Sequence, residues 1–219
     1  MMSEGGKTYD VGDVLPVSTF KEGTNVLVSG PARSGKTTLG TRILAGAPRN
    51  GEGSLAITTD GNADDILDTY REHDGDGALH LVDCSGSGAG PPPDFPPDRY
   101  QTVGSPSDMT GVGVAFEKYA KKIGDRVDGS RVMYDSLTTL LQYVEEKRAY
   151  RFIDVLTGRF RAEGDLSVFT VDGGTIDERT SHMFMHEFDV EVKIRVEDDV
   201  REVLIDGHTE APDDWTRLD

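Results

Sequence analysis

The residues best suited to chemistry lie together in one glycine-rich segment, Gly30-Pro31-Ala32-Arg33-Ser34-Gly35-Lys36-Thr37. The segment fits the pattern G-x-x-x-x-G-K-[ST] of a phosphate-binding loop, or P-loop, at every fixed position. Glycines allow a tight turn in which successive backbone N–H groups point at an anion. In this pattern the ammonium of Lys36 reaches the β- and γ-phosphates of a nucleotide, and the hydroxyl of Thr37 ligates Mg²⁺.

A P-loop connects a buried strand to a helix, and the residues on either side of this segment predict both elements. The apolar run Asn25–Ser29 predicts a buried strand, and Thr38–Ala45 predicts a helix that ends at Gly46. The positive end of that helix would face the bound phosphates. We therefore predict that the residues from Gly30 to Thr38 bind nucleotide, and a chance glycine-rich turn is the weaker interpretation.

A second candidate residue is an aspartate at the end of another apolar run. Asp135 follows Val132-Met133-Tyr134, as expected for a carboxylate at the end of a buried strand. There it can ligate Mg²⁺ through water or accept a hydrogen bond from Thr37. The alternative is that Asp135 caps the helix predicted to begin at Leu137. The metal role is favoured because the chain also carries a complete P-loop.

The elements that must position these residues alternate between strands and helices. Apolar runs predict further strands at 54–58, 79–83, 131–134 and 166–171. Helical spacing predicts further helices at 63–73, 107–124 and 137–161, the last one interrupted near Gly158 or earlier. Within 187–206, alternating residues flank an acidic turn and predict an antiparallel hairpin. We therefore expect an α/β fold with a mostly parallel central sheet flanked by helices.

The length of 219 residues suits one folded core. We expect an N-terminal tail and lead-in over residues 1–23, a single domain over 24–210 and an acidic tail over 211–219. The scattered apolar residues at 11–20 predict either a short edge strand or a lid. Residues 85–107 are rich in Pro and Gly, and we expect them to form a long surface loop without regular structure.

The composition restricts the partners of the chain. Its 40 acidic and 23 basic residues leave a formal net charge of −17. An Asp-rich, Lys-poor chain resembles the halophilic cytoplasmic proteins of haloarchaea, which stay soluble in strong salt through excess acid. The same charge argues against an extended nucleic-acid surface, because such a surface needs clustered Lys and Arg.

Cysteine use and hydropathy predict a cytoplasmic protein. The lone Cys84 allows no internal disulfide and favours a reducing compartment. Residues 1–13 lack the apolar core of a signal peptide. No stretch of the sequence approaches the roughly 20 apolar residues of a membrane span.

Two segments resemble the KaiC-like branch of the RecA-like P-loop ATPases. They are 23–30, which leads into the P-loop, and 134–140, which contains Asp-Ser-Leu-Thr. The order of elements agrees as well, including the C-terminal hairpin. The resemblance implies a RecA-like sheet in which strand 166–171 lies between the P-loop strand and the strand of Asp135. It also implies ATP and Mg²⁺ as cofactors, and a homo-oligomer such as a ring or dimer, or assembly with a protein partner.

The chain departs from this branch at two places that matter for hydrolysis. Members of the branch end the second strand with paired glutamates, one of which is the base for the attacking water. The matching residue here is Asp60, a shorter candidate base for which a turn residue is the equal alternative. Members also offer Lys and Arg from the last strand to a neighbouring nucleotide, and Val203–Gly207 has neither. Arg195 and Arg201 lie several residues away, and Arg33 could compensate.

These features favour an ATP-binding, Mg²⁺-dependent protein with weak or partner-dependent hydrolysis, acting as an assembling or regulatory ATPase. Lys36, Asp60 and Asp135 are its candidate catalytic residues. The main alternative is a nucleotide-binding switch or scaffold that does not hydrolyse ATP. A small-molecule kinase is less favoured because the arginines at 148–161 fall on a predicted helix rather than a lid. A DNA recombinase is less favoured because no basic stripe is visible.

Overall fold

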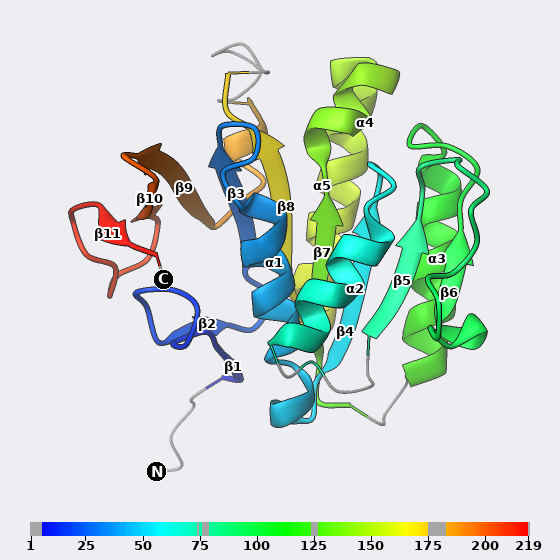
Figure 1. Cartoon of the computed structure of the whole chain (residues 1–219), viewed down its shortest axis with the longest axis horizontal. Coiled ribbons are helices and arrows are strands. Elements are labelled where there is room, and N and C mark those ends of the chain that lie inside the picture. The colour runs from blue at the N-terminus through cyan, green and yellow to red at the C-terminus, as the bar shows by residue number, and fades with distance from the viewer. Residues whose placement is uncertain (1–5, 74, 76–78, 124–126, 175–182, 219) are drawn as a thin grey trace.

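A nine-stranded sheet forms the centre of the molecule (Figure 1). The structure is a computed structural model, and it describes residues 6–73, 75, 79–123, 127–174 and 183–218. The strands lie in the order β11-β10-β9-β3-β8-β7-β4-β5-β6. Neighbours from β9 to β6 are parallel, whereas β10 and β11 are antiparallel to their neighbours. This is the mostly parallel sheet that the alternation of elements predicted.

The predicted strands are all present, with small shifts at their ends. The bounds are β3 (Asn25–Gly30), β4 (Gly53–Thr58), β5 (Leu79–Asp83), β6 (Tyr100–Thr102), β7 (Ser130–Asp135), β8 (Leu166–Asp172), β9 (Val190–Glu197), β10 (Val200–Asp206) and β11 (Thr216–Arg217). β8 lies between β3 and β7, as the resemblance implied. The hairpin is β9–β10, and β11 extends it, so part of the expected acidic tail at 211–219 pairs with the sheet.

Helices cover both faces of the sheet (Figure 1). Their bounds are α1 (Lys36–Ala45), α2 (Ala63–Glu72), α3 (Met109–Ile123), α4 (Leu137–Tyr143) and α5 (Glu146–Glu163), with short 3-10 helices η1 (Pro48–Asn50) and η2 (Pro97–Arg99). α1 and α2 pack on one face, and α3, α4 and α5 pack on the other. No helix in the described ranges is long and apolar enough to cross a membrane.

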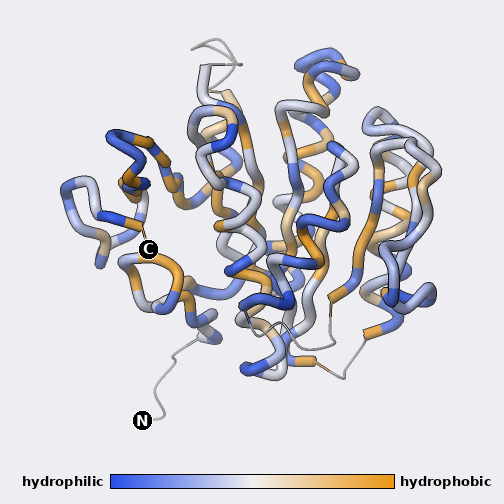
Figure 2. The backbone as a smooth tube through the Cα atoms, viewed as in Figure 1, coloured by the Kyte–Doolittle hydropathy of each residue, from blue (hydrophilic) through white to orange (hydrophobic). Residues whose placement is uncertain are grey.

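The side chains of β3 show how one strand serves both layers. Val26 and Val28 pack with Leu39 of α1, whereas Leu27 lies in the cluster that contains Phe160 of α5. Every residue of β4 and of β7 is buried. Strands covered on both faces read as continuous apolar runs, which is why the sequence revealed them. Figure 2 shows hydrophobic residues along the central strands and hydrophilic ones at the outer turns.

The N-terminal segment is more ordered than the predicted tail. β1 (Thr8–Asp10) pairs with β2 (Thr19–Lys21) in a separate two-stranded sheet, with Tyr9 opposite Phe20. Both of these side chains are fully or almost fully buried, and they pack in one cluster with apolar residues of β3, β9 and β10. The segment therefore packs against the core, as the lid alternative predicted, and it does not form an edge strand of the main sheet.

The Pro- and Gly-rich stretch 85–107 is not wholly irregular, contrary to expectation. It contains η2 and β6, and β6 extends the sheet by pairing with β5. The hydroxyl of Tyr100 donates to Asp83 Oδ2 at 2.9 Å, and its ring meets that of the buried Phe95 edge-on. These two aromatic side chains hold the stretch against the rest of the fold. The Pro and Gly content of the stretch did not indicate this packing.

The helical region after β7 is interrupted at Val144 and Glu145, both of which are extended. The interruption therefore comes earlier than Gly158, which lies inside α5. α4 starts after Ser136, whose Oγ accepts from the backbone N–H of Thr139 at 3.3 Å. Ser136 is the cap of this helix, so the interpretation of Asp135 as its cap is wrong.

Candidate functional site

The glycine-rich segment forms a tight loop between the end of β3 and the start of α1. Gly30 is the last residue of β3, and α1 begins at Lys36, two residues before the predicted start. A Cβ atom on Gly30 would lie 2.8 Å from the carbonyl oxygen of Ile194, so this position has no room for a side chain. Gly35 has a φ of 95°, in the left-handed region that favours glycine. The shape of the loop therefore requires both fixed glycines.

The side chain of Lys36 is buried at the base of this loop, with 7% of the residue exposed. Its Nζ donates to the carbonyl oxygen of Gly30 at 3.1 Å and to that of Pro31 at 2.6 Å. It also forms an ion pair with Oδ1 of Asp172 at 2.7 Å. The ammonium group is therefore held by three oxygen atoms of the chain.

Asp135 lies at the C-terminal end of β7, where three side chains donate to its carboxylate. Thr37 Oγ1 lies 3.1 Å from each carboxylate oxygen, as the sequence predicted. Asn62 Nδ2 donates to Oδ2 at 2.8 Å, and the hydroxyl of Thr170 donates to Oδ1. Asp135 is 2% exposed, and burial raises the pKa of its carboxyl, while the three donors act in the opposite direction. The peptide bond that follows Asp135 is cis.

Asp60 follows β4 and lines the same cleft as Asp135, with an exposed side chain. The hydroxyl of Thr139 donates to Asp60 Oδ1, and Thr59 Oγ1 lies 3.2 Å from the same oxygen. Ser136 Oγ lies 3.4 Å from Oδ2. The carboxylate is therefore turned toward the first turn of α4 by hydroxyl donors.

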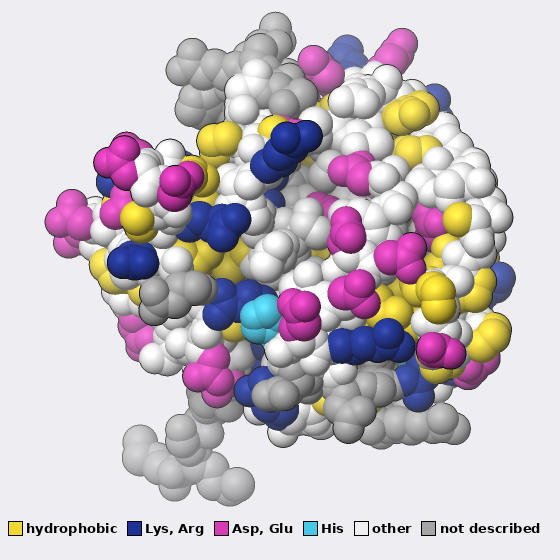
Figure 3. Space-filling view, in the orientation of Figure 1, with side chains coloured by type: hydrophobic (Ala, Val, Ile, Leu, Met, Phe, Trp, Pro, Cys, Tyr) yellow, Lys and Arg dark blue, Asp and Glu magenta, His cyan; other side chains and the backbone are white. Residues whose placement is uncertain are grey.

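These residues line one cleft of about 540 Å³. The predicted residues that line it are Ala32, Arg33, Gly35, Lys36, Thr37, Thr38, Asp60 and Asp135. The remaining three, Gly30, Pro31 and Ser34, belong to the loop without lining the cleft, and Ser34 is 1% exposed. The fold therefore brings together residues from the ends of β3, β4 and β7. Figure 3 shows basic side chains beside the P-loop, both basic and acidic ones on the hairpin, and acidic ones over α2.

Two charged residues of the cleft were not assigned to it from the sequence. Asp172 directly follows the predicted strand 166–171, and parallel strands end at one edge, so a signal for it was present. Arg201 lies several residues from the position at which the family resemblance expects a basic residue. It comes from β10, and a Cβ atom on Gly35 would lie 3.2 Å from its Nε. The hairpin thus brings Arg201 to the loop of its own chain, and no local sequence pattern predicts that approach.

The order of strands and the P-loop at the end of β3 define an α/β fold of the P-loop NTPase type. The crystal structure of a KaiC-like protein from the hyperthermophilic archaeon Pyrococcus horikoshii is similar to this structure. The match covers 91% of this chain and 86% of that one, with a TM-score of 0.63 and 17% sequence identity. This similarity shows that the fold is RecA-like, as predicted.

The chain belongs to a family of unknown function, DUF7504, whose model matches residues 23–194. The matched range contains the P-loop, Asp60, Asp135 and Asp172, and it ends within β9. None of the curated proteins matches the chain.

Proposed function

We propose that this protein binds ATP with Mg²⁺ in the cleft at the P-loop, and that it hydrolyses ATP slowly unless a partner completes the site. The observation that carries the proposal is the meeting of Lys36, Thr37 and Asp135 in one cleft. Open α/β sheets bind ligands at this edge, outside the carboxyl ends of their strands. The volume of about 540 Å³ is within the roughly 300–1,000 Å³ typical of small-molecule sites.

The loop has the shape that a chain of phosphates needs. Gly30 lies so close to Ile194 that a Cβ atom would not fit, and Gly35 has a positive φ immediately before α1. This shape supports a role for backbone N–H groups and the N-terminus of α1 in holding phosphate oxygens. Lys36 and Arg201 add positive charge in the same cleft. Their charges would offset part of the negative charge of a triphosphate.

The oxygen donors beside the loop suit Mg²⁺. Thr37 Oγ1 and the Asp135 carboxylate lie 3.1 Å apart, and both are hard ligands. In the described ranges no three His, Cys, Asp or Glu side chains form a group that could hold a metal. A small set of protein ligands is typical of Mg²⁺, which keeps several waters and shares the substrate's phosphates. When bound, the ion would neutralise charge that develops on those phosphates.

Slow hydrolysis follows from the position that would supply the base. The carboxylate of Asp60 is one methylene shorter than a glutamate and already accepts from Thr139 and Thr59. A carboxylate that already accepts hydrogen bonds from these hydroxyls is poorly placed to activate a water molecule. A misplacement of about 1 Å can lower a reaction rate roughly 10²-fold. The same feature favours a second candidate function, a nucleotide-binding switch or scaffold that does not hydrolyse ATP.

Assembly is part of the proposal. The KaiC-like resemblance supports a homo-oligomer or a protein partner that contributes to the site. The formal net charge of −17 supports function in concentrated salt, because excess acid keeps a protein soluble there. Both features can be followed in the experiment that tests nucleotide binding.

The test measures binding of Mg-ATP and release of phosphate in the same samples, over a range of KCl concentrations and with the mass of the assembly recorded. The wild-type protein should bind Mg-ATP, and both Lys36→Ala and Asp135→Asn should weaken that binding strongly. Lys118→Ala is the matched control, because Lys118 is exposed on α3 outside the cleft. Binding that survives both cleft substitutions would refute the proposal. Turnover near background with intact binding would favour the switch over the ATPase.

A further inference from the structure

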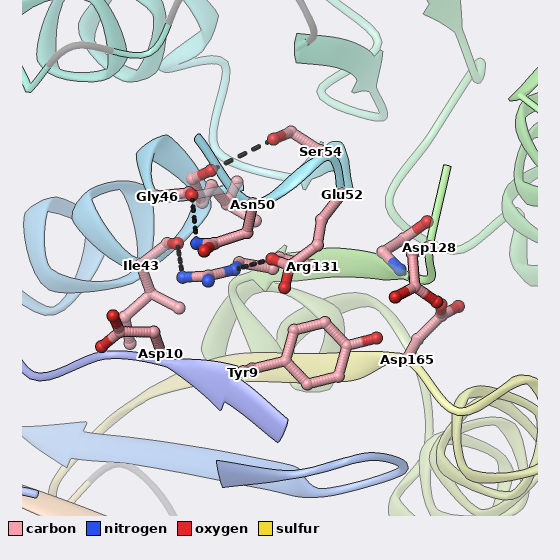
Figure 4. Close-up of polar contacts among 12 residues, drawn as sticks. Tyr9, Asp10, Ile43, Gly46, Asn50, Glu52, Ser54, Asp128, Arg131 and Asp165 are labelled. Atoms are coloured by element: carbon pink, nitrogen blue, oxygen red, sulfur yellow. Dashed lines mark hydrogen bonds and ion pairs between the residues drawn. The ribbon is translucent and has the colours of Figure 1, made fainter. Parts of the chain in front are cut away.

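A buried arginine at the other end of β7 has an unsatisfied donor. Arg131 lies near the start of β7, whereas Asp135 lies at its end, and the side chain of Arg131 is 1% exposed. Its Nε donates to Glu52 Oε2 at 2.6 Å, and its Nη1 donates to the carbonyl oxygen of Ile43 at 2.8 Å. Figure 4 shows the guanidinium between these two partners, beside the ring of Tyr9. Within the described ranges, Nη2 has no hydrogen-bond partner.

An unsatisfied guanidinium nitrogen in this position indicates a missing acceptor. Buried polar groups in folded proteins nearly always have a hydrogen-bond partner, and arginine can only donate. Glu52 is itself 4% exposed, and burial raises the pKa of its carboxyl, whereas the neighbouring Arg131 lowers it. The carboxylate of Glu52 therefore already accepts a hydrogen bond from Nε of Arg131. A ligand that meets Nη2 must bring its own acceptor atoms.

A cavity of about 380 Å³ lies beside Arg131, at the edge of the sheet opposite the P-loop cleft. Two further arginines line it, Arg42 from α1 and Arg49, which belongs to η1. Arg42 Nη2 donates to the carbonyl oxygen of Asp13 at 3.4 Å, and Arg49 Nη2 donates to that of His73 at 3.1 Å. These contacts connect the N-terminal segment, α1, η1 and the end of α2 around the cavity. With Arg131 of β7, its walls come from five separate parts of the chain.

The charges of the cavity select the kind of ligand. Three arginines meet here in a chain with 40 acidic and only 23 basic residues, and three carboxylates in the same lining balance their charge. Asp10, Asp13 and Glu72 line the same cavity, and Asp13 lies 3.6 Å from Arg49. These carboxylates would repel a ligand with several anionic groups. On a ligand with a single phosphate or carboxylate group, they would accept hydrogen bonds from its hydroxyl or ammonium groups.

We propose that this cavity is a second ligand site, which binds the oxyanion group, phosphate or carboxylate, of a small polar molecule against Arg131 and Arg42. The planar guanidinium group of arginine can donate two parallel hydrogen bonds to either a phosphate or a carboxylate. The volume is within the roughly 300–1,000 Å³ typical of small-molecule sites. The proposal is independent of ATP binding, because it uses none of the residues of the P-loop cleft.

The test titrates the full-length protein with inorganic phosphate and, separately, with acetate, each against chloride at equal ionic strength. It uses a Lys36→Ala background, so that phosphate held by the P-loop lysine does not contribute. At least one of the two anions should bind. Because a hydrogen bond to a charged group is lost, Arg42→Gln should weaken binding roughly tenfold or more. Arg148→Gln, an exposed arginine on α5, is the matched control and should change nothing.

A second measurement locates the anion without a substitution at Arg131, which could prevent folding. In nitrogen-detected NMR, the side-chain signals of Arg131 should shift on titration, because its guanidinium would gain an acceptor. The proposal is overturned if neither anion binds, if Arg42→Gln has no effect, or if the Arg131 signals stay in place. Binding of phosphate alone supports a phosphorylated ligand, and binding of acetate supports a carboxylated one. Failure here would leave Mg-ATP binding by the wild-type protein untouched.

Discussion

The carboxylate of Asp172 lies 2.7 Å from the ammonium of Lys36, at the floor of the P-loop cleft. The two residues meet because β3 and β8 are neighbours in register, with Gly30 opposite Asp172. The backbone N–H of Asp172 donates to Thr138 Oγ1 at 2.7 Å, which fixes the end of β8. Asp172 is therefore a built-in acceptor, and the phosphate oxygens of the proposed nucleotide would compete with it for the same lysine.

Removing the charge of Asp172 should strengthen nucleotide binding. In Asp172→Asn the ammonium of Lys36 loses its ion pair, and the cleft loses one negative charge that repels the triphosphate. The side chain of Asp172 is 34% exposed, so solvent screens the pair, and we expect only about a three- to tenfold gain in affinity for Mg-ATP. Titration with a fluorescent ATP analogue would measure it. Asp98→Asn removes an exposed carboxylate paired with Lys122 and serves as the control. An affinity that falls or stays constant would show that Asp172 does not compete.

Lengthening the side chain at position 60 should raise turnover. A glutamate reaches further than the carboxylate of Asp60, beyond the hydroxyls of Thr139 and Thr59 that now hold it. We expect Asp60→Glu to increase phosphate release at saturating Mg-ATP, by up to about 10²-fold if the carboxylate reaches the attacking water. Asp68→Glu, on the exposed side of α2, controls for a general effect of the extra methylene. Equal turnover in both variants would argue that position 60 has no part in hydrolysis.

Protonation of Asp165 should make stability depend on pH. Burial raises the pKa of Asp165 to about 7, with a smaller opposing effect from the backbone N–H of Ser130, which donates to Oδ1 at 2.9 Å. In the unfolded chain the pKa is about 3.9. Between these two values the folded state binds the extra proton, so the free energy of unfolding should fall as pH rises from about 4 to about 7, by at most roughly 1.4 kcal/mol per pH unit.

Asp165→Asn isolates this contribution, since an asparagine can still accept from Ser130 but cannot titrate. Urea unfolding at several pH values should show a shallower fall in stability for the variant than for the wild type. Parallel curves for the two proteins would mean that Asp165 titrates normally in the folded state.

The buried pair of Glu52 and Arg131 should be strongly coupled. Glu52→Leu leaves the Nε of Arg131 buried without its acceptor, and loss of one partner of such a pair typically costs about 3–5 kcal/mol. Adding Arg131→Met should restore part of this loss, because neither charge is then buried. Urea unfolding of the two single variants and the double variant measures the coupling. The partly exposed surface pair of Arg159 and Glu163 is the comparison, and Glu163→Gln should cost less than about 1 kcal/mol. Additive effects at Glu52 and Arg131 would exclude coupling.

Local pattern was sufficient to predict much of the fold. β4 and β7 are buried on both faces, and each contains a central apolar run, Leu55-Ala56-Ile57 and Val132-Met133-Tyr134. The loop pattern located the turn before α1, since Gly30 and Gly35 have conformational reasons to be glycine. The contact between Thr37 and Asp135 was predicted because parallel strands end at one edge.

The parts that escaped prediction depend on contacts between distant residues. β6 is held by Tyr100, which reaches Asp83, within a stretch whose Pro and Gly content indicates a loop. The N-terminal hairpin is held by burial of Tyr9 and Phe20 against the core. Arg201 reaches the P-loop only because β10 folds back beside β9. In each case, tertiary packing decided a conformation that local propensity left open.

The two outermost strands of the main sheet, β6 and β11, are only three and two residues long. A long edge strand exposes unpaired backbone N–H and C=O groups, which can pair with another chain and lead to fibre growth. Edge strands as short as these expose few such groups. The outer strands β6 and β11 themselves therefore offer little backbone for extending the sheet into a second molecule.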